Sequence, residues 1–162
     1  FGWAKIVKSQ KLKVKNLGYG PEPLGEDFSP DYLVDIFSKT RRPIKIVLMD
    51  QEKIAGLGNI YANEALFAAG IDPRRPANSL TRREVAKLYE ATIKILQAAI
   101  KAGGTSAADD AYVKPDATPG GYQRYLKVYQ QAGKPCPRCR KGIIKRLNLA
   151  GRGTFFCPCC QK

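Results

Sequence analysis

The sequence predicts a mainly α-helical fold that is followed by a small β-hairpin. Three observations predict this fold class. A long segment repeats apolar residues at helical spacing after a helix-start signal, shorter segments before it end at glycine, and two close cysteine pairs flank a glycine-containing turn near the C-terminal end. With 162 residues, 44% of them hydrophobic, the chain has enough apolar material for one ordinary core or two small ones.

The first helix is expected after a linker. Residues 17–27 are rich in glycine, proline and acidic residues, which is typical of a connecting segment. Ser29 and Pro30 then form a start signal, because serine caps a helix well and proline is tolerated in its first turn. We expect this helix to run to about Lys39. Residues 3–8 resemble a short strand without a nearby partner, so we expect them to belong to a sheet outside this chain.

Two further helices are expected before residue 70. A short one spans 43–49, and the next begins near Asn59 and ends before Gly70, since glycine commonly stops a helix. The apolar residues of this third helix, Ile60 and Leu66 among them, fit one buried side.

The fourth helix carries the clearest signal. Thr81 to Glu84 form a capping box, and apolar residues then recur at helical spacing until Gly103-Gly104. Residues 122–130 are also expected to be helical. Residues 105–121, between these segments, are small, polar, proline or glycine residues, and such a long loop in a compact domain usually has a function.

Four of the five cysteines predict a zinc site. They form two Cys-x-x-Cys pairs, and 17 residues separate one pair from the next. Two such pairs place four thiolates in a tetrahedron around one ion, which leaves no position for a reacting water, so the zinc is expected to be structural. The ligands are Cys136, Cys139, Cys157 and Cys160, and Cys159 is interpreted as a bystander because its spacing from Cys157 is wrong. A pair of disulfides is the less favoured interpretation.

The charge predicts a polyanionic partner. Lys and Arg total 28 against 14 Asp and Glu, which gives a net charge of +14. Such an excess favours nucleic acid over a basic surface without a partner. An anionic membrane is less favoured, because no helix places a large apolar face opposite a lysine-rich one. The chain contains no histidine, so any acid–base or metal chemistry must use other residues.

Several motifs, taken in order, resemble the formamidopyrimidine-DNA glycosylase family. They are the Phe-Gly pair at 1–2, the segment at 17–24, the Pro-Ile-Lys segment with Leu-Met-Asp at 43–50, GLGNIYANEALF at 56–67 and RGTFFCP at 152–158. The segment at 56–67 is very similar to the helix-two-turn-helix signature of that family. The resemblance covers essentially the whole chain.

The resemblance implies the domain organisation. It implies a remnant strand and linker of an N-terminal β-sandwich domain over 1–25, a helix-two-turn-helix DNA-binding domain over 26–133 and a four-cysteine zinc-finger hairpin over 134–162. The rest of the β-sandwich domain, with the N-terminal Pro-Glu that attacks the sugar of the flipped nucleotide, is expected to be missing. We therefore expect a C-terminal part that still associates with its other half.

The resemblance also implies a function. The intact protein would be a bifunctional DNA glycosylase and AP lyase that removes oxidised purines from duplex DNA. This part would recognise and hold the DNA, and would be inactive alone. We expect no membrane association, a monomer when intact, and a bacterial cytoplasmic location close to the nucleoid.

The resemblance assigns roles to individual residues. Asn59, at a helix start, would contact phosphate, and Arg152, between two glycines at the hairpin tip, would grip the phosphates around the flipped nucleotide and assist the second elimination. Phe1 would be the wedge that enters the base stack. Lys45 and one of Lys39 or Arg41 match positions near the DNA-contacting surface.

Some alternatives stay open on sequence alone. The sequence does not decide which of Lys39, Arg41 and Arg42 touches phosphate, and a departure from the family pattern at 112–121 leaves the preferred lesion undetermined. An endonuclease-VIII-like relative for oxidised pyrimidines is the nearest alternative, although the Phe-Gly pair favours the purine-lesion branch. A non-catalytic zinc-ribbon protein that binds nucleic acid is the rival from another class.

Overall fold

The computed structural model describes residues 18–105 and 120–162. Its elements, in chain order, are α1 (Pro30–Ser38), α2 (Ile44–Leu48), α3 (Asn59–Ala69), the 3-10 helix η2 (Ala77–Ser79), α4 (Arg82–Lys101), the 3-10 helix η3 (Tyr122–Tyr125), β1 (Lys145–Leu149) and β2 (Arg152–Phe156). The two strands form one antiparallel sheet. The mainly helical fold with a small β-hairpin is therefore confirmed, while the strand expected at 3–8 lies outside the described residues.

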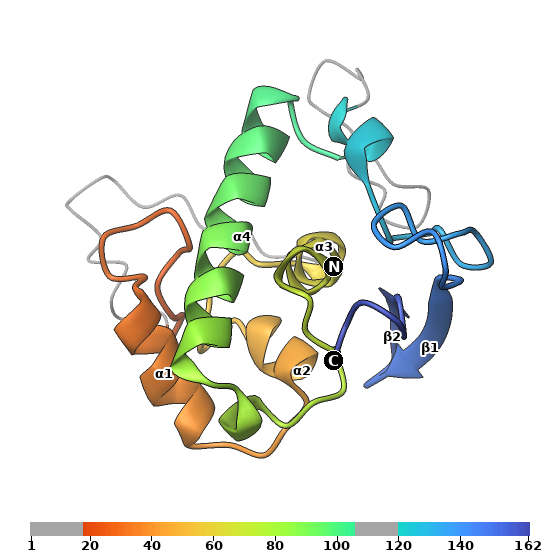
Figure 1. The fold of residues 1–162 in the computed structure, drawn as a ribbon. Coiled ribbons are helices and arrows are strands. Elements are labelled where there is room, and N and C mark those ends of the chain that lie inside the picture. The colour runs from red at the N-terminus through yellow and green to blue at the C-terminus, as the bar shows by residue number, and fades with distance from the viewer. Residues whose placement is uncertain (1–17, 106–119) are drawn as a thin grey trace.

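Helix α3 is the centre of the molecule. Figure 1 shows it nearly end-on, with α1, α2 and α4 to one side and the hairpin to the other. Leu66 packs into the helical core, whereas Ile60 and Phe67 pack into a second cluster with Phe155 of β2. The expectation of one buried side was therefore wrong, because α3 lies between two cores and is covered on both.

The helix ends follow local signals. The side chain of Ser29 accepts a hydrogen bond from the backbone N–H of Tyr32 at 3.2 Å, and Thr81 and Glu84 complete the capping box of α4. Helix α3 ends at Gly70, whose φ of 77° lies in the left-handed region that favours glycine. Both helix starts and the glycine stop were predicted from sequence.

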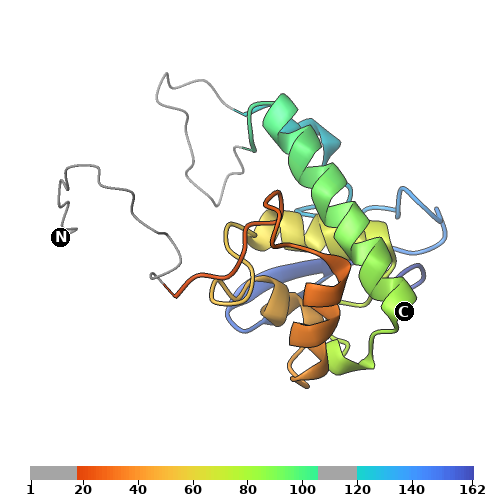
Figure 2. The ribbon, with the colours of Figure 1, turned by 90° about the vertical axis from the view of Figure 1, so that its left-hand side faces the viewer.

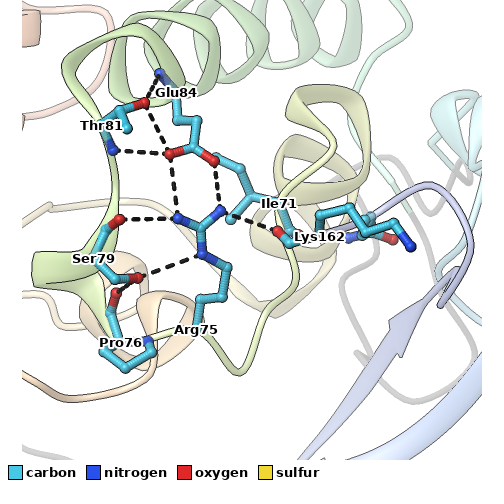
Figure 3. A network of polar contacts seen from close by, with 8 residues as sticks. Ile71, Arg75, Pro76, Ser79, Thr81, Glu84 and Lys162 are labelled. Atoms are coloured by element: carbon cyan, nitrogen blue, oxygen red, sulfur yellow. Dashed lines mark hydrogen bonds and ion pairs between the residues drawn. The ribbon is translucent and has the colours of Figure 1, made fainter.

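An arginine ties the loop after α3 to the start of α4 (Figure 3). The guanidinium of Arg75 binds both carboxylate oxygens of Glu84 and donates to the backbone oxygens of Ser79, at 3.0 Å, and Lys162, at 3.1 Å. The hydrogen bond from Arg75 lowers the pKa of Glu84 to about 2. The network fixes the C-terminal residues against the helical core.

The hairpin turns more tightly than the sequence suggested. Ala150 and Gly151 alone form the turn, with φ values of 50° and 76°, as in the two-residue turns that match the twist of paired strands. Arg152 is consequently the first residue of β2 and pairs with Leu149. Arg152 therefore lies at the start of a paired strand and not within the turn of the hairpin.

The segment after η3 consists of bends and a turn and is not helical. Helical structure ends at Tyr125, although residues 122–130 were expected to be helical. The cause is the carboxylate of Glu64 on α3, which accepts the backbone N–H groups of Lys127, Val128 and Tyr129 at 2.9–3.0 Å. Those N–H groups would otherwise have to point along a helix.

Glu64 should therefore be a main determinant of stability. Glu64→Ala leaves three buried N–H groups without an acceptor, and we expect the free energy of unfolding to fall by at least about 3 kcal/mol in urea denaturation. The matched control is Glu90→Ala on the exposed side of α4, which should change it by less than about 0.5 kcal/mol. Equal effects of the two substitutions would contradict the role assigned to Glu64.

Candidate nucleic-acid interface and metal centre

Four cysteine thiols converge at the base of the hairpin. The Sγ atoms of Cys136, Cys139, Cys157 and Cys160 all lie within 4.8 Å of one another. The Cys136–Cys160 and Cys139–Cys157 Sγ distances are 3.5 and 3.8 Å. Zn–S bonds of 2.3 Å in a tetrahedron require Sγ atoms about 3.8 Å apart, so this donor set fits one zinc ion.

The fifth cysteine is outside this set. Cys159 is exposed, while Cys136 and Cys157 are buried. The chain passes closely behind the thiols at Gly142, where a Cβ atom would lie 2.8 Å from the Sγ atoms of both Cys157 and Cys159. The Gly142 backbone N–H also donates to the Cys139 Sγ at 3.4 Å.

The start of α3 is open. Its N-cap is Gly58, which offers no side chain, so among residues 18–105 and 120–162 the first amides of the helix have no side-chain acceptor. A hollow of about 400 Å³ lies there, lined by Gly56, Gly58, Asn59, Ile60 and Tyr61 together with Gly104 and Thr105. Free N–H groups at a helix start form a site for an anion such as phosphate.

Asn59 is held by its neighbours. It is the first residue of α3, and its amide nitrogen lies 3.4 Å from the Tyr129 hydroxyl. Asn63, one turn later, donates to the Asn59 backbone oxygen at 2.8 Å and to its side-chain oxygen at 3.2 Å. The Asn63 side-chain oxygen accepts the backbone N–H of Phe155 at 2.7 Å. Asn63 therefore joins the start of α3 directly to β2.

Lys45 is buried. The resemblance places it near the DNA-contacting surface, and in the structure its side chain is 0% exposed. Its Nζ donates to the Gly153 backbone oxygen at 3.0 Å and to Thr154 Oγ1 at 2.8 Å, so it holds the hairpin from below. Burial, and then the nearby Arg152 guanidinium, lowers the pKa of Lys45 to about 8.

The other basic residues differ in their surroundings. Arg152 is exposed, and within the described ranges its side chain has no hydrogen-bond or ion-pair partner. Lys39 is exposed and paired with Asp35. Arg42 forms an ion pair with Asp50 at 2.8 Å, while Arg41 is exposed without such a pair among the described residues. Phe1 lies outside the described residues, and direct phosphate contacts of all these residues stay predictions.

Hydrogen bonds link Asn59 through Asn63 to β2, the strand that carries Arg152, and Lys45 binds the same strand. Sequence reasoning missed Asn63, Tyr129 and Arg138. Asn63 lies four residues after Asn59 within the quoted signature, so the helical repeat was the available signal. Arg138, in the first cysteine pair, donates to the backbone oxygens of Phe67 and Ala68 and lies over the Phe67 ring, and no local signal indicated this long-range contact.

Comparison with protein families identifies the chain. Residues 19–110, more than half of it, match the formamidopyrimidine-DNA glycosylase H2TH domain, and residues 133–162 match a zinc finger found in FPG and IleRS. The chain belongs to the formamidopyrimidine-DNA glycosylase family. The family zinc finger and the four converging thiols together establish one structural zinc as its cofactor.

The chain is also similar in sequence to individual members of the family. The chain is 46% identical to the formamidopyrimidine-DNA glycosylase of Thermus thermophilus over 145 residues, which are 90% of this chain and 54% of the relative. It is 46% identical to that of Desulfitobacterium hafniense over an alignment 163 residues long, which covers 99% of this chain and 59% of the relative. The chain thus spans a little over half the length of these relatives.

Solved structures of family members have the same fold. The crystal structure of the Thermus thermophilus MutM (Fpg) protein matches with a TM-score of 0.85 over 90% of this chain and 54% of that one, at 46% identity. Lactococcus lactis Fpg in complex with abasic-site DNA matches with a TM-score of 0.80 over 90% and 52%, at 39% identity.

Zinc content should separate the ligands from the bystander. We expect one zinc per chain, retained in Cys159→Ser and lost in Cys157→Ser, because only Cys157 belongs to the tetrahedron. Metal analysis of the purified variants checks this. Chelation of the zinc should unfold the hairpin, since two strands alone bury too little apolar surface to be stable. A zinc-free chain, or loss of zinc in the Cys159 variant, would contradict the assignment.

Proposed function

We propose that this chain is the DNA-binding part of a base-excision repair glycosylase and that it holds duplex DNA by its phosphates. The observation that carries the proposal is the joining of the open α3 start to the Arg152 hairpin by Asn63. One of these features offers helix amides and the other a guanidinium, and both suit a phosphate oxygen. The net charge of +14 supports the same partner.

The solved relatives support damaged DNA as the substrate class. Those of Lactococcus lactis include complexes with abasic-site DNA and with DNA that contains Fapy-dG, an opened purine. For the intact protein we propose a glycosylase that flips oxidised purines out of the duplex and also cleaves the strand as an AP lyase. Arg152 would hold the phosphates beside the flipped nucleotide and assist the second elimination.

The proposed chemistry needs residues beyond this chain. The family resemblance assigns the nucleophile to an N-terminal proline that is followed by a glutamate. The sequence of 162 residues starts with Phe1-Gly2 and not with that Pro-Glu pair. We therefore propose that the chain alone binds duplex DNA and does not cut it. An oxidised-guanine duplex incubated with the purified chain should stay intact, while appearance of strand breaks would overturn this statement.

The relatives support a proposal for the cellular location of the protein. The chain's relatives named here are bacterial, and no helix in the described ranges is long and apolar enough to cross a membrane. We propose a monomer that works on chromosomal DNA in the bacterial cytoplasm, together with an N-terminal β-sandwich domain. An endonuclease-VIII-like enzyme and a non-catalytic zinc ribbon are not favoured, since these relatives carry the formamidopyrimidine name.

Two substitutions test the phosphate contacts. Asn59→Ala and Arg152→Ala should each weaken binding to a duplex with an abasic-site analogue by roughly ten- to hundredfold, since a contact to a charged group contributes about 1.5–3 kcal/mol. Fluorescence polarisation at fixed salt measures this. Zinc content should stay at one, which shows an intact fold. The matched control is Arg83→Ala, which removes an exposed arginine on α4. An equal loss of affinity in this variant would show that the loss comes from net charge and not from a specific phosphate contact.

The pH dependence of binding tests Lys45. Its amine has a pKa of about 8 in the free chain, and a phosphate held beside Arg152 favours the charged amine and raises that pKa. Binding therefore takes up a proton, so affinity should be full below pH 8 and fall as pH rises from 8 to 9.5, by up to about tenfold for each pKa unit of the shift. In Lys45→Met the affinity should be nearly flat over this range. Identical pH profiles for the two proteins would contradict the role of Lys45.

A further inference from the structure

A second pocket lies along the second half of α3. Its volume is about 690 Å³, within the range of ligand-binding pockets. It is lined from the second half of α3 by Glu64, Phe67 and Ala68, and it shares no residue with the hollow at the helix start. Figure 2 shows α3, in yellow, lying across the view, with the loop before it at one end and the C-terminus of the chain toward the other. We call this hollow the α3–α4 pocket.

The floor of the α3–α4 pocket is apolar. Phe67, Ile95, Ala98 and Tyr122 contribute to it, and exposed Tyr125 stands at its edge. Among the described residues of the lining the one acidic side chain is Glu64, which is buried and whose oxygens already accept three backbone N–H groups. The pocket thus offers space for a large apolar side chain, and the one carboxylate among its described lining residues is already used by backbone N–H groups.

The rim of the α3–α4 pocket is basic. Lys94 and Lys101 lie on α4, and Lys127 and Arg138 lie across from them. All four are exposed, and none makes an ion pair within the described ranges. Arg138 already donates to the end of α3, which fixes its position beside the pocket.

The spacing of these charges indicates an extended ligand. Lys94 and Lys101 are seven residues apart on one helix face, which corresponds to about 10 Å at 1.5 Å per residue. An extended peptide covers this distance with about three residues. A single carboxylate or phosphate would meet only part of the rim, whereas several carboxylates along a peptide match it.

We propose that the α3–α4 pocket binds an acidic peptide segment of a partner protein, which inserts a large apolar side chain between α3 and α4. The charge complementarity comes from the rim and the anchoring from the floor. Because the pocket shares no residue with the α3 start, the peptide and DNA bind at the same time. The pocket thus gives the chain a means of recruitment to other proteins that is independent of damage recognition.

Fluorescence polarisation with a fluorescein-labelled hexapeptide, Asp-Asp-Phe-Asp-Asp-Phe, tests the proposal on the full chain. Lys94→Glu combined with Lys101→Glu should weaken binding by at least about tenfold. The matched control is Arg83→Glu with Lys87→Glu, which makes the same charge change on the same helix outside the pocket and should cost less than about threefold. An equal loss in both pairs would overturn the proposal in favour of attraction by net charge.

Two further arms test the floor and the separation from DNA. Ala98→Phe should abolish peptide binding by filling the pocket without changing charge, with zinc content as the check on folding. A peptide with Ser in place of Phe should bind at least about tenfold more weakly. Saturating undamaged duplex should leave the labelled peptide bound. Tight binding of the Ser peptide, unchanged binding to the Ala98 variant, or displacement by duplex would each overturn the proposal, whatever the outcome for Asn59 and Arg152.

Discussion

The structure depends on the burial of two neighbouring polar side chains on α3. Asn63 and Glu64 are 1% and 3% exposed, and each binds backbone groups of the C-terminal part of the chain. Asn63 takes the N–H of Phe155 on β2, and Glu64 takes three N–H groups of the segment that leads to the zinc site. A buried polar group is tolerated only when it is satisfied, so these bonds admit one position of the zinc finger against α3.

This docking links two sources of positive potential through one chain of hydrogen bonds, from the start of α3 through Asn63 to β2. At the start of α3 the first amides have no side-chain acceptor among the described residues, and at the start of β2 Arg152 is free of ion pairs within the same part of the chain. Lys45, beneath the hairpin, adds a third cation whose proton is held weakly because it is buried beside Arg152. The positive groups of this cluster repel one another, and a bound anion would relieve that repulsion. This is the electrostatic arrangement that a preformed phosphate site requires. The zinc acts indirectly, by keeping the hairpin folded so that it can dock.

Local features were predictable from sequence, and long-range ones were not. The caps at Ser29 and Thr81 and the two cysteine pairs depend on neighbours a few residues apart, and the structure has them where expected. The burial of Lys45 depends on a strand more than a hundred residues later, and a lysine beside other basic residues carries no sign of it. The non-helical segment after Tyr125 is likewise imposed by Glu64, more than sixty residues earlier, which overrides its local helical pattern.

The central claim is that docking through Asn63 makes Arg152 available to the DNA, and a double-mutant cycle tests it most directly. DNA affinity is measured for Asn63→Ala, Arg152→Ala and the double variant, with zinc content checked in each. If the hairpin must be docked for Arg152 to reach phosphate, the second substitution adds little to the first, and the coupling energy is about 1 kcal/mol or more. Additive losses, with a coupling energy near zero, would show that Arg152 contacts DNA whether or not Asn63 holds β2, and would contradict the account.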